Sequence, residues 1–135
     1  MLTLETARNL IAAGESEARD RGLKLSFAVV DAGGHVVAVA RMDDAEWITP
    51  EVALGKAWTA AAYRAPSDEQ GKKAKDLIAF AGAISAATGG RYTPQIGGLP
   101  IRIDGAAAGG LGASGASGQE DEDVCRAALE SVLGS

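Results

Sequence analysis

The segment Gly97-Gly98-Leu99-Pro100-Ile101-Arg102-Ile103-Asp104-Gly105 decides the fold of this 135-residue chain. Its leucine and two isoleucines alternate with proline, arginine and aspartate, which is the period of a β-strand with one buried face. The closing Asp104-Gly105 pair is typical of a tight hairpin turn, so residues 106–113 are expected to return as the partner strand. Because proline cannot donate to a sheet ladder, Pro100 indicates the start of a strand or a sheet edge.

Residues on both sides of this hairpin add further helices and a second hairpin. Helical spacing predicts a helix from Thr3 to Arg21, and two strands around a Gly-Gly turn are predicted in residues 25–41. Further helix starts are indicated by Thr49 as an N-cap before Pro50, by a capping-box pattern at Ser67 and by a second one at Ser117, with expected spans of 49–64, 67–87 and 117 to the chain end. Hairpins separated by helices favour an α+β fold with a central antiparallel sheet flanked by helices, and the length fits one domain over residues 1–135.

A glycine run in the second predicted strand has the form of a nucleotide-binding motif. Residues 110–115 match G-x-G-x-x-G between a strand and a helix. About twenty residues follow, too few for the rest of a dinucleotide-binding unit, and the acids of residues 120–123 would repel a pyrophosphate. We interpret the glycines as allowing close packing on a helix or a neighbouring subunit, and the acids as complementing the helix dipole.

Composition excludes several classes of protein. A formal net charge of −5 with scattered lysines and arginines argues against nucleic-acid binding. No apolar run reaches the roughly 20 residues that cross a bilayer, and no signal peptide is visible, so we expect a cytoplasmic protein with no membrane partner. A single cysteine and a single histidine exclude an internal disulfide and a protein-only zinc site, so no metal site is predicted.

Candidate site residues follow from polarity and position. A long loop over residues 88–98 is a candidate functional loop, and cations near a strand end suit a carboxylate ligand, although surface ion pairs would use the same residues. For ligand binding the candidates are Arg41, Lys56, Arg91, Gly97 and Gly98, and for acid–base chemistry they are Asp31, Lys56, Tyr63 and Tyr92. Ser114 lacks the glycine spacing of a nucleophile elbow.

Four motifs occur in an order that resembles one family. The segments Val29–Ala38, Arg41–Asp43, Lys56–Ala61 and Gly97–Ile101 are similar to those of the GlcG/HbpS family, also known from the C-terminal domain of PduO proteins. The resemblance covers essentially the whole chain. It implies a profilin-like α+β domain that forms homo-oligomers, from dimers to octamers, and it implies binding of haem or a related tetrapyrrole.

One departure from the family concerns the iron ligand. The resemblance implies an axial histidine on the first helix, and residues 3–21 contain none. Haem iron would have to accept His35, Met42, Cys125 or a tyrosine instead. Three interpretations therefore remain open: a protein that binds haem or another small molecule, an enzyme acting on a small oxygenated or carboxylated metabolite without a metal, and a non-catalytic accessory oligomer.

Overall fold

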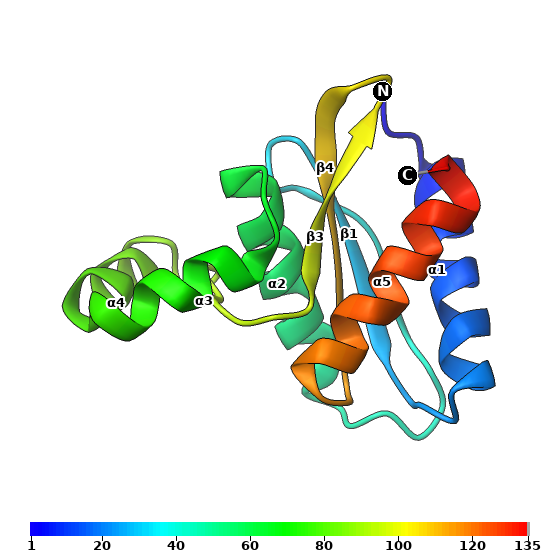
Figure 1. Cartoon of the computed structure of the whole chain (residues 1–135), viewed down its shortest axis with the longest axis horizontal. Coiled ribbons are helices and arrows are strands. Elements are labelled where there is room, and N and C mark those ends of the chain that lie inside the picture. Colours follow the sequence, from blue (N-terminus) through cyan, green and yellow to red (C-terminus); the bar gives the residue numbers. More distant parts are fainter. Residues whose placement is uncertain (135) are drawn as a thin grey trace.

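A computed structural model describes residues 1–134. The elements in chain order are α1 (Leu4–Asp20), β1 (Ser26–Asp31), β2 (Val36–Arg41), α2 (Thr49–Tyr63), α3 (Ser67–Asp76), α4 (Ile78–Ala87), β3 (Gly98–Ile103), β4 (Ala106–Ser114) and α5 (Gly118–Leu133). The strands form one antiparallel sheet in the order β2-β1-β4-β3 (Figure 1). The predicted α+β fold with a central antiparallel sheet is confirmed.

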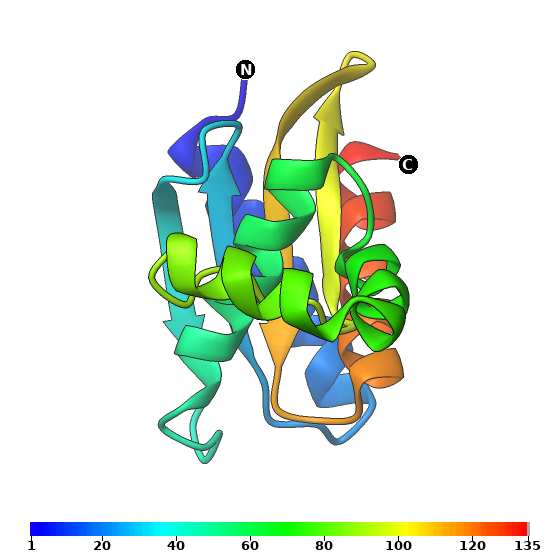
Figure 2. The same ribbon diagram turned by 90° about the vertical axis from the view of Figure 1, so that its left-hand side faces the viewer.

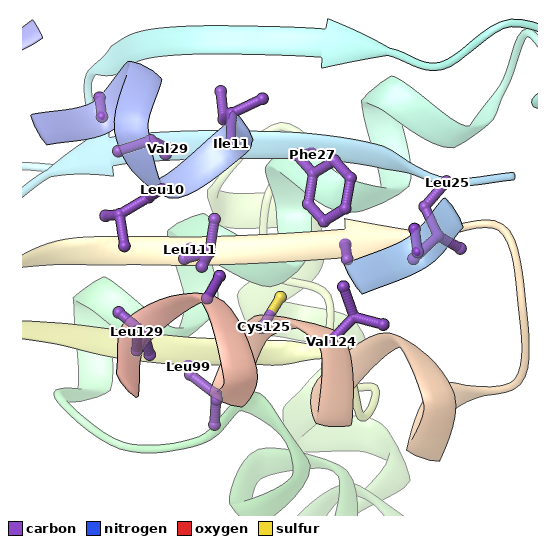
Figure 3. Close-up of a cluster of buried hydrophobic side chains, with 14 of the residues drawn as sticks. Leu10, Ile11, Leu25, Phe27, Val29, Leu99, Leu111, Val124, Cys125 and Leu129 are labelled. Atoms are coloured by element: carbon purple, nitrogen blue, oxygen red, sulfur yellow. The ribbon is translucent and has the colours of Figure 1, made fainter. Parts of the chain in front are cut away.

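Helices cover both faces of the sheet. On one face, the larger side chains of the strands pack against α1 and α5, and Figure 3 shows Phe27, Val29 and Leu111 facing Leu10 and Val124 there. On the other face α2 lies against small residues, among them Ala28 of β1. Each large side chain removed from water stabilises the fold by about 1.5–3 kcal/mol, so the α1–α5 face holds most of the hydrophobic core.

The glycines of β4 let α2 lie close to the sheet. A Cβ atom at Gly110 would overlap the carbonyl oxygen of Ala57, and one at Gly112 would overlap that of Ala53. Only glycine leaves room for the helix backbone at these two positions. The glycine run is therefore a packing surface for a helix, as interpreted from the sequence.

The Asp104-Gly105 turn and the edge position of β3 are both confirmed. Asp104 has φ 53° and Gly105 has φ 79°, the pair of positive values that a type I′ hairpin turn requires. Strand β3 pairs only with β4 and lies at the sheet edge, which accommodates Pro100.

All four predicted helix starts are confirmed to within one residue, and at two of them a side chain caps the helix. The Thr3 side chain accepts a hydrogen bond from the N–H group of Thr6 at the start of α1. At the start of α5, Ser117 and Glu120 form the reciprocal capping box that the sequence predicts.

The capping roles predicted for Thr49 and Ser67 are wrong, although α2 and α3 begin at these residues. Thr49 is the first residue of α2, and its hydroxyl donates to the carbonyl oxygen of Glu46 rather than capping the helix. Pro66 precedes α3, and the Ser67 hydroxyl donates to the carbonyl oxygen of Gln95 and accepts the N–H group of Gly98 at 2.9 Å. Ser67 therefore holds the 88–97 loop against α3. Its hydroxyl group forms these hydrogen bonds with residues distant in sequence instead of capping its own helix.

Helices α3 and α4 form an arm that projects from the sheet (Figures 1 and 2). The predicted single helix over 67–87 breaks at Leu77, where φ is −127° and ψ is 55°, and not at Gly82. None of the residues of α4 is buried, although most of them are apolar. No helix in the described part of the chain is long and apolar enough to span a bilayer.

Candidate functional site

Both hairpin turns and the N-terminus lie at the same end of the sheet (Figure 2). A cavity is lined by residues of these three segments. Its volume is about 530 Å³, and organic ligands occupy cavities of about 300–1,000 Å³. The lining is mostly apolar and consists of Met1, Leu2, Asp31, Ala32, Gly33, His35, Ile103, Ala106, Ala107 and Ala108. We call this the His35 cavity.

Asp31 fixes the turn that carries His35. One carboxylate oxygen, Oδ1, accepts the N–H groups of Gly33 at 2.9 Å and His35 at 3.0 Å, and the imidazole Nδ1 lies 3.4 Å from it. The hydrogen bond from the His35 N–H group is the main cause that lowers the pKa of Asp31. A proton on Nδ1 facing this carboxylate leaves the Nε2 lone pair available, which is the arrangement of metal-binding histidines.

Met1 also lines the His35 cavity, whereas the other iron-ligand candidates named from the sequence lie elsewhere. Met42 and Cys125 are buried in the core, and burial raises the pKa of the Cys125 thiol far above its usual range. The Tyr92 hydroxyl is buried and donates to Gln70 at 3.1 Å, and burial also raises its pKa. Tyr63 is 41% exposed at the end of α2 and contacts the Tyr92 ring edge-on. None of these four residues lines the His35 cavity.

A groove runs between α1 and the edge strand β2. It has a volume of about 440 Å³ and is lined by Leu4, Arg8, Ile11, Glu15 and residues 37–40. None of these residues is a histidine, cysteine, methionine or tyrosine. The groove therefore supplies no iron ligand of these types, in agreement with the absence of a histidine from α1.

Lys56 and Asp121 form a buried ion pair at the opposite end of the sheet. The ammonium group of Lys56 lies 3.0 Å from Asp121 Oδ2, and the two side chains are 5% and 2% exposed. Lys56 also donates to the carbonyl oxygen of Ala113 at 3.1 Å, and Asp121 Oδ1 accepts the Ala116 N–H group at 3.1 Å. Burial raises the pKa of the Asp121 carboxyl group, although Lys56 opposes the shift.

The ion pair joins the two helical layers across the sheet. Lys56 belongs to α2 and Asp121 to α5, which cover opposite faces. The Lys56 side chain passes beside Gly97, where a Cβ atom would lie 2.7 Å from the ammonium nitrogen. Gly97 has φ 133°, and Gly98 is packed against the carbonyl group of Lys56. These two glycines, predicted as ligand-binding residues, adjoin Lys56.

A second cavity, of about 470 Å³, opens beside this ion pair. It is lined by Val52, Lys56, Asp68, Gly71, Lys75, Pro94, Gln95, Ile96, Ser114, Ala116, Gly118 and Asp121. We call this the Lys56 cavity. Helices α2 and α3, the 88–97 loop, the end of β4 and the start of α5 therefore supply its walls.

The structure separates most of the predicted site residues. Arg41 is exposed at the end of β2, and Arg91 is exposed on the 88–97 loop. Neither arginine lines the Lys56 cavity or the His35 cavity. Among the acid–base candidates only the two tyrosines touch each other, because Asp31 and Lys56 belong to the two different cavities.

The burial of Asp121 has no signal in the sequence. The acids of residues 120–123 are expected to complement the helix dipole, and Glu120 does serve the cap of α5. Asp121 departs from that expectation because its side chain turns into the interior toward Lys56. The two residues are 65 positions apart, so no local pattern connects them.

These features define an α+β domain with a ligand-sized cavity at each end of one sheet. The chain belongs to the GlcG/HbpS family: residues 2–130 match the HbpS-like family model, described as "Haem degrading protein HbpS-like". The chain is 35% identical to protein GlcG of Escherichia coli strain K12 over 114 residues, which cover 84% of this chain and 81% of GlcG.

Two solved structures extend the similarity to three dimensions. A double mutant of Streptomyces reticuli HbpS superposes with a TM-score of 0.85 at 33% identity, covering 99% of this chain and 88% of the other. A structure described as a PduOC–heme complex superposes with a TM-score of 0.88 at 29% identity, covering 98% of this chain and 95% of the other.

Proposed function

We propose that this protein binds haem or another flat tetrapyrrole in the His35 cavity, with His35 as the ligand of the iron. The observation that carries the proposal is the position of His35 on an apolar cavity, with Nδ1 beside Asp31 and Nε2 available. The similarity to the protein in the PduOC–heme complex supports the same class of ligand.

The residues of the His35 cavity fit such a ligand chemically. Histidine is a common ligand of haem iron, and the carboxylate of Asp31 would orient the imidazole and increase its basicity. The alanines of β4 and Ile103 provide an apolar wall for a planar ring system. Haem, when bound, would supply a redox-active iron, which His35 would ligate, and the apolar wall would exclude water from one side.

Haemin titration of the purified protein tests this proposal. We expect a saturable shift of the Soret band in the wild type and loss of that shift in His35→Ala, with recovery when imidazole is added. Tyr63→Phe is the matched control, because it removes an exposed phenol outside the cavity, and it should bind as the wild type does. An unshifted Soret band in the wild type, or wild-type binding by His35→Ala, would overturn the proposal.

We also propose that the chain forms a homo-oligomer through α4. Ile78 is 76% exposed and Phe80 59%, and an apolar helix with no buried residue needs a covering surface. Light scattering after size exclusion should show a smaller species for Ile78→Asp/Phe80→Asp. Leu4→Asp, an exposed leucine on α1, should leave the mass unchanged. A monomeric wild type would contradict this proposal.

A further inference from the structure

The Lys56 cavity contains a hydroxyl group without a partner. Ser114, the last residue of β4, is only 8% exposed, and its hydroxyl has no hydrogen-bond partner among residues 1–134. All fully enclosed polar side-chain atoms in that part of the chain do have partners. The Ser114 hydroxyl therefore borders open space, and the open space beside it is the Lys56 cavity.

Lys56 supplies a second hydrogen-bond donor at the same place. An ammonium group carries three N–H bonds, and the described residues accept two of them, through Ala113 and Asp121. The Asp121 carboxylate is committed to Lys56 and to the Ala116 N–H group, so its charge is balanced. The third N–H of Lys56 has no acceptor among residues 1–134, and Lys56 lines the cavity.

One lysine of the cavity lining has no ion-pair partner among the described residues. Among the lining residues Asp68 is balanced by Lys72, whose ammonium group lies 3.5 Å from it. Lys75 is exposed and has no carboxylate within 4.0 Å in residues 1–134. Lys75 is thus the one uncompensated charge among the described lining side chains, and it favours an anion.

We propose that the Lys56 cavity binds a small organic carboxylate. The Ser114 hydroxyl and the third N–H of Lys56 donate to its oxygens, and Lys75 attracts it at the mouth. A carboxylate is the group that accepts several hydrogen bonds from such donors at once. This site lies at the other end of the sheet from the His35 cavity and does not depend on haem binding.

Calorimetric titration with three acid–amide pairs tests the site: acetate and acetamide, lactate and lactamide, benzoate and benzamide. We expect at least one carboxylate to bind, and its amide to bind at least about tenfold more weakly, because a charged acceptor strengthens each hydrogen bond. Ser114→Ala should weaken binding of that carboxylate about tenfold. Lys75→Met should weaken it about threefold at low salt, since an exposed charge is screened.

Lys73→Met is the matched control, since it removes an exposed lysine of the same helix that does not line the cavity and has no carboxylate within 4.0 Å in residues 1–134. It should leave the affinity unchanged, and circular dichroism should show all three variants folded. The proposal is overturned if none of the three carboxylates binds, if each amide binds as tightly as its acid, or if the folded Ser114→Ala variant binds like the wild type.

Discussion

Polar side chains form long-range contacts at one end of the sheet and only local contacts at the other. At the Lys56 end an ammonium and a carboxylate are buried together and connect α2 with α5. At the other end Asp31 and His35 belong to one exposed hairpin turn, and their hydrogen bonds stay within five residues. The difference indicates that the Lys56 end contributes more to stability, whereas side chains at the His35 end can be replaced with little effect on folding.

The largest expected effect is that of Lys56→Met. Removing one partner of a buried ion pair leaves an uncompensated charge and costs about 3–5 kcal/mol of unfolding free energy. Urea unfolding of the variant measures this cost. Lys56→Met/Asp121→Leu should recover much of it, because neither charge then remains. A loss below about 1 kcal/mol in Lys56→Met would show that the two ends do not differ in this way.

Gly97→Ala should have the next largest effect. The new Cβ would meet the Lys56 ammonium group, and φ 133° strains any residue other than glycine, so we expect a loss of about 1–3 kcal/mol in urea unfolding. Gly105→Ala is the matched control, since its φ is also positive at 79° and no atom lies within 4 Å of the Cβ position. Equal losses in the two variants would argue against a specific contact with Lys56.

We expect the carboxyl groups of Asp31 and Asp121 to change the free energy of unfolding in opposite directions with pH. The pKa of Asp31 is lowered by folding, so its stabilising effect is present above the ordinary value of 3.8 and is lost as the pH falls through the folded value. The pKa of Asp121 is raised by folding. Its titration therefore stabilises the folded state fully below pH 3.8, and this contribution is lost as the pH rises through the pKa of the folded state.

Asp31→Asn and Asp121→Asn, each compared with the wild type by urea unfolding from pH 3 to pH 7, separate these effects. The stability advantage of the wild type over Asp31→Asn should shrink on acidification. Relative to Asp121→Asn, the wild type should lose stability as the pH rises above 3.8. The same direction of change in both comparisons would contradict the opposite environments of the two carboxyl groups.

His35→Ala should have the smallest effect on stability. The side chain is 83% exposed, and exposed substitutions usually change the free energy of unfolding by less than about 0.5 kcal/mol. Urea unfolding without haemin measures the change. A loss above about 1 kcal/mol would mean that His35 has a structural role in the turn.

Local patterns predicted the hairpins and the α5 cap because the partners lie within a few residues. The Asp104-Gly105 turn and the Ser117–Glu120 box are of this kind. Thr49 and Ser67 had the same local chemistry, but the Thr49 hydroxyl bonds with Glu46 and with the distant Ser26, and the Ser67 hydroxyl bonds with the distant Gln95. A helix cap is predictable only where no distant acceptor or donor competes for the side chain.

The candidate sites were predictable only in part. Lys56, Asp31 and His35 were named from the sequence, and the structure places them on two cavities. The Ser114 hydroxyl and Asp121 acquire their positions from contacts between β4, α2 and α5, segments that are distant in sequence. Which polar groups share a cavity depends on the packing of these layers, and no spacing of residues encodes it directly.

Hydrogen–deuterium exchange with and without saturating haemin tests most directly which end of the sheet binds the tetrapyrrole. We predict protection in residues 1–5, 31–36 and 103–108, and no protection in residues 52–56 and 114–121. Protection in the α1–β2 groove or at the Lys56 end, with unchanged exchange around His35, would contradict the assignment.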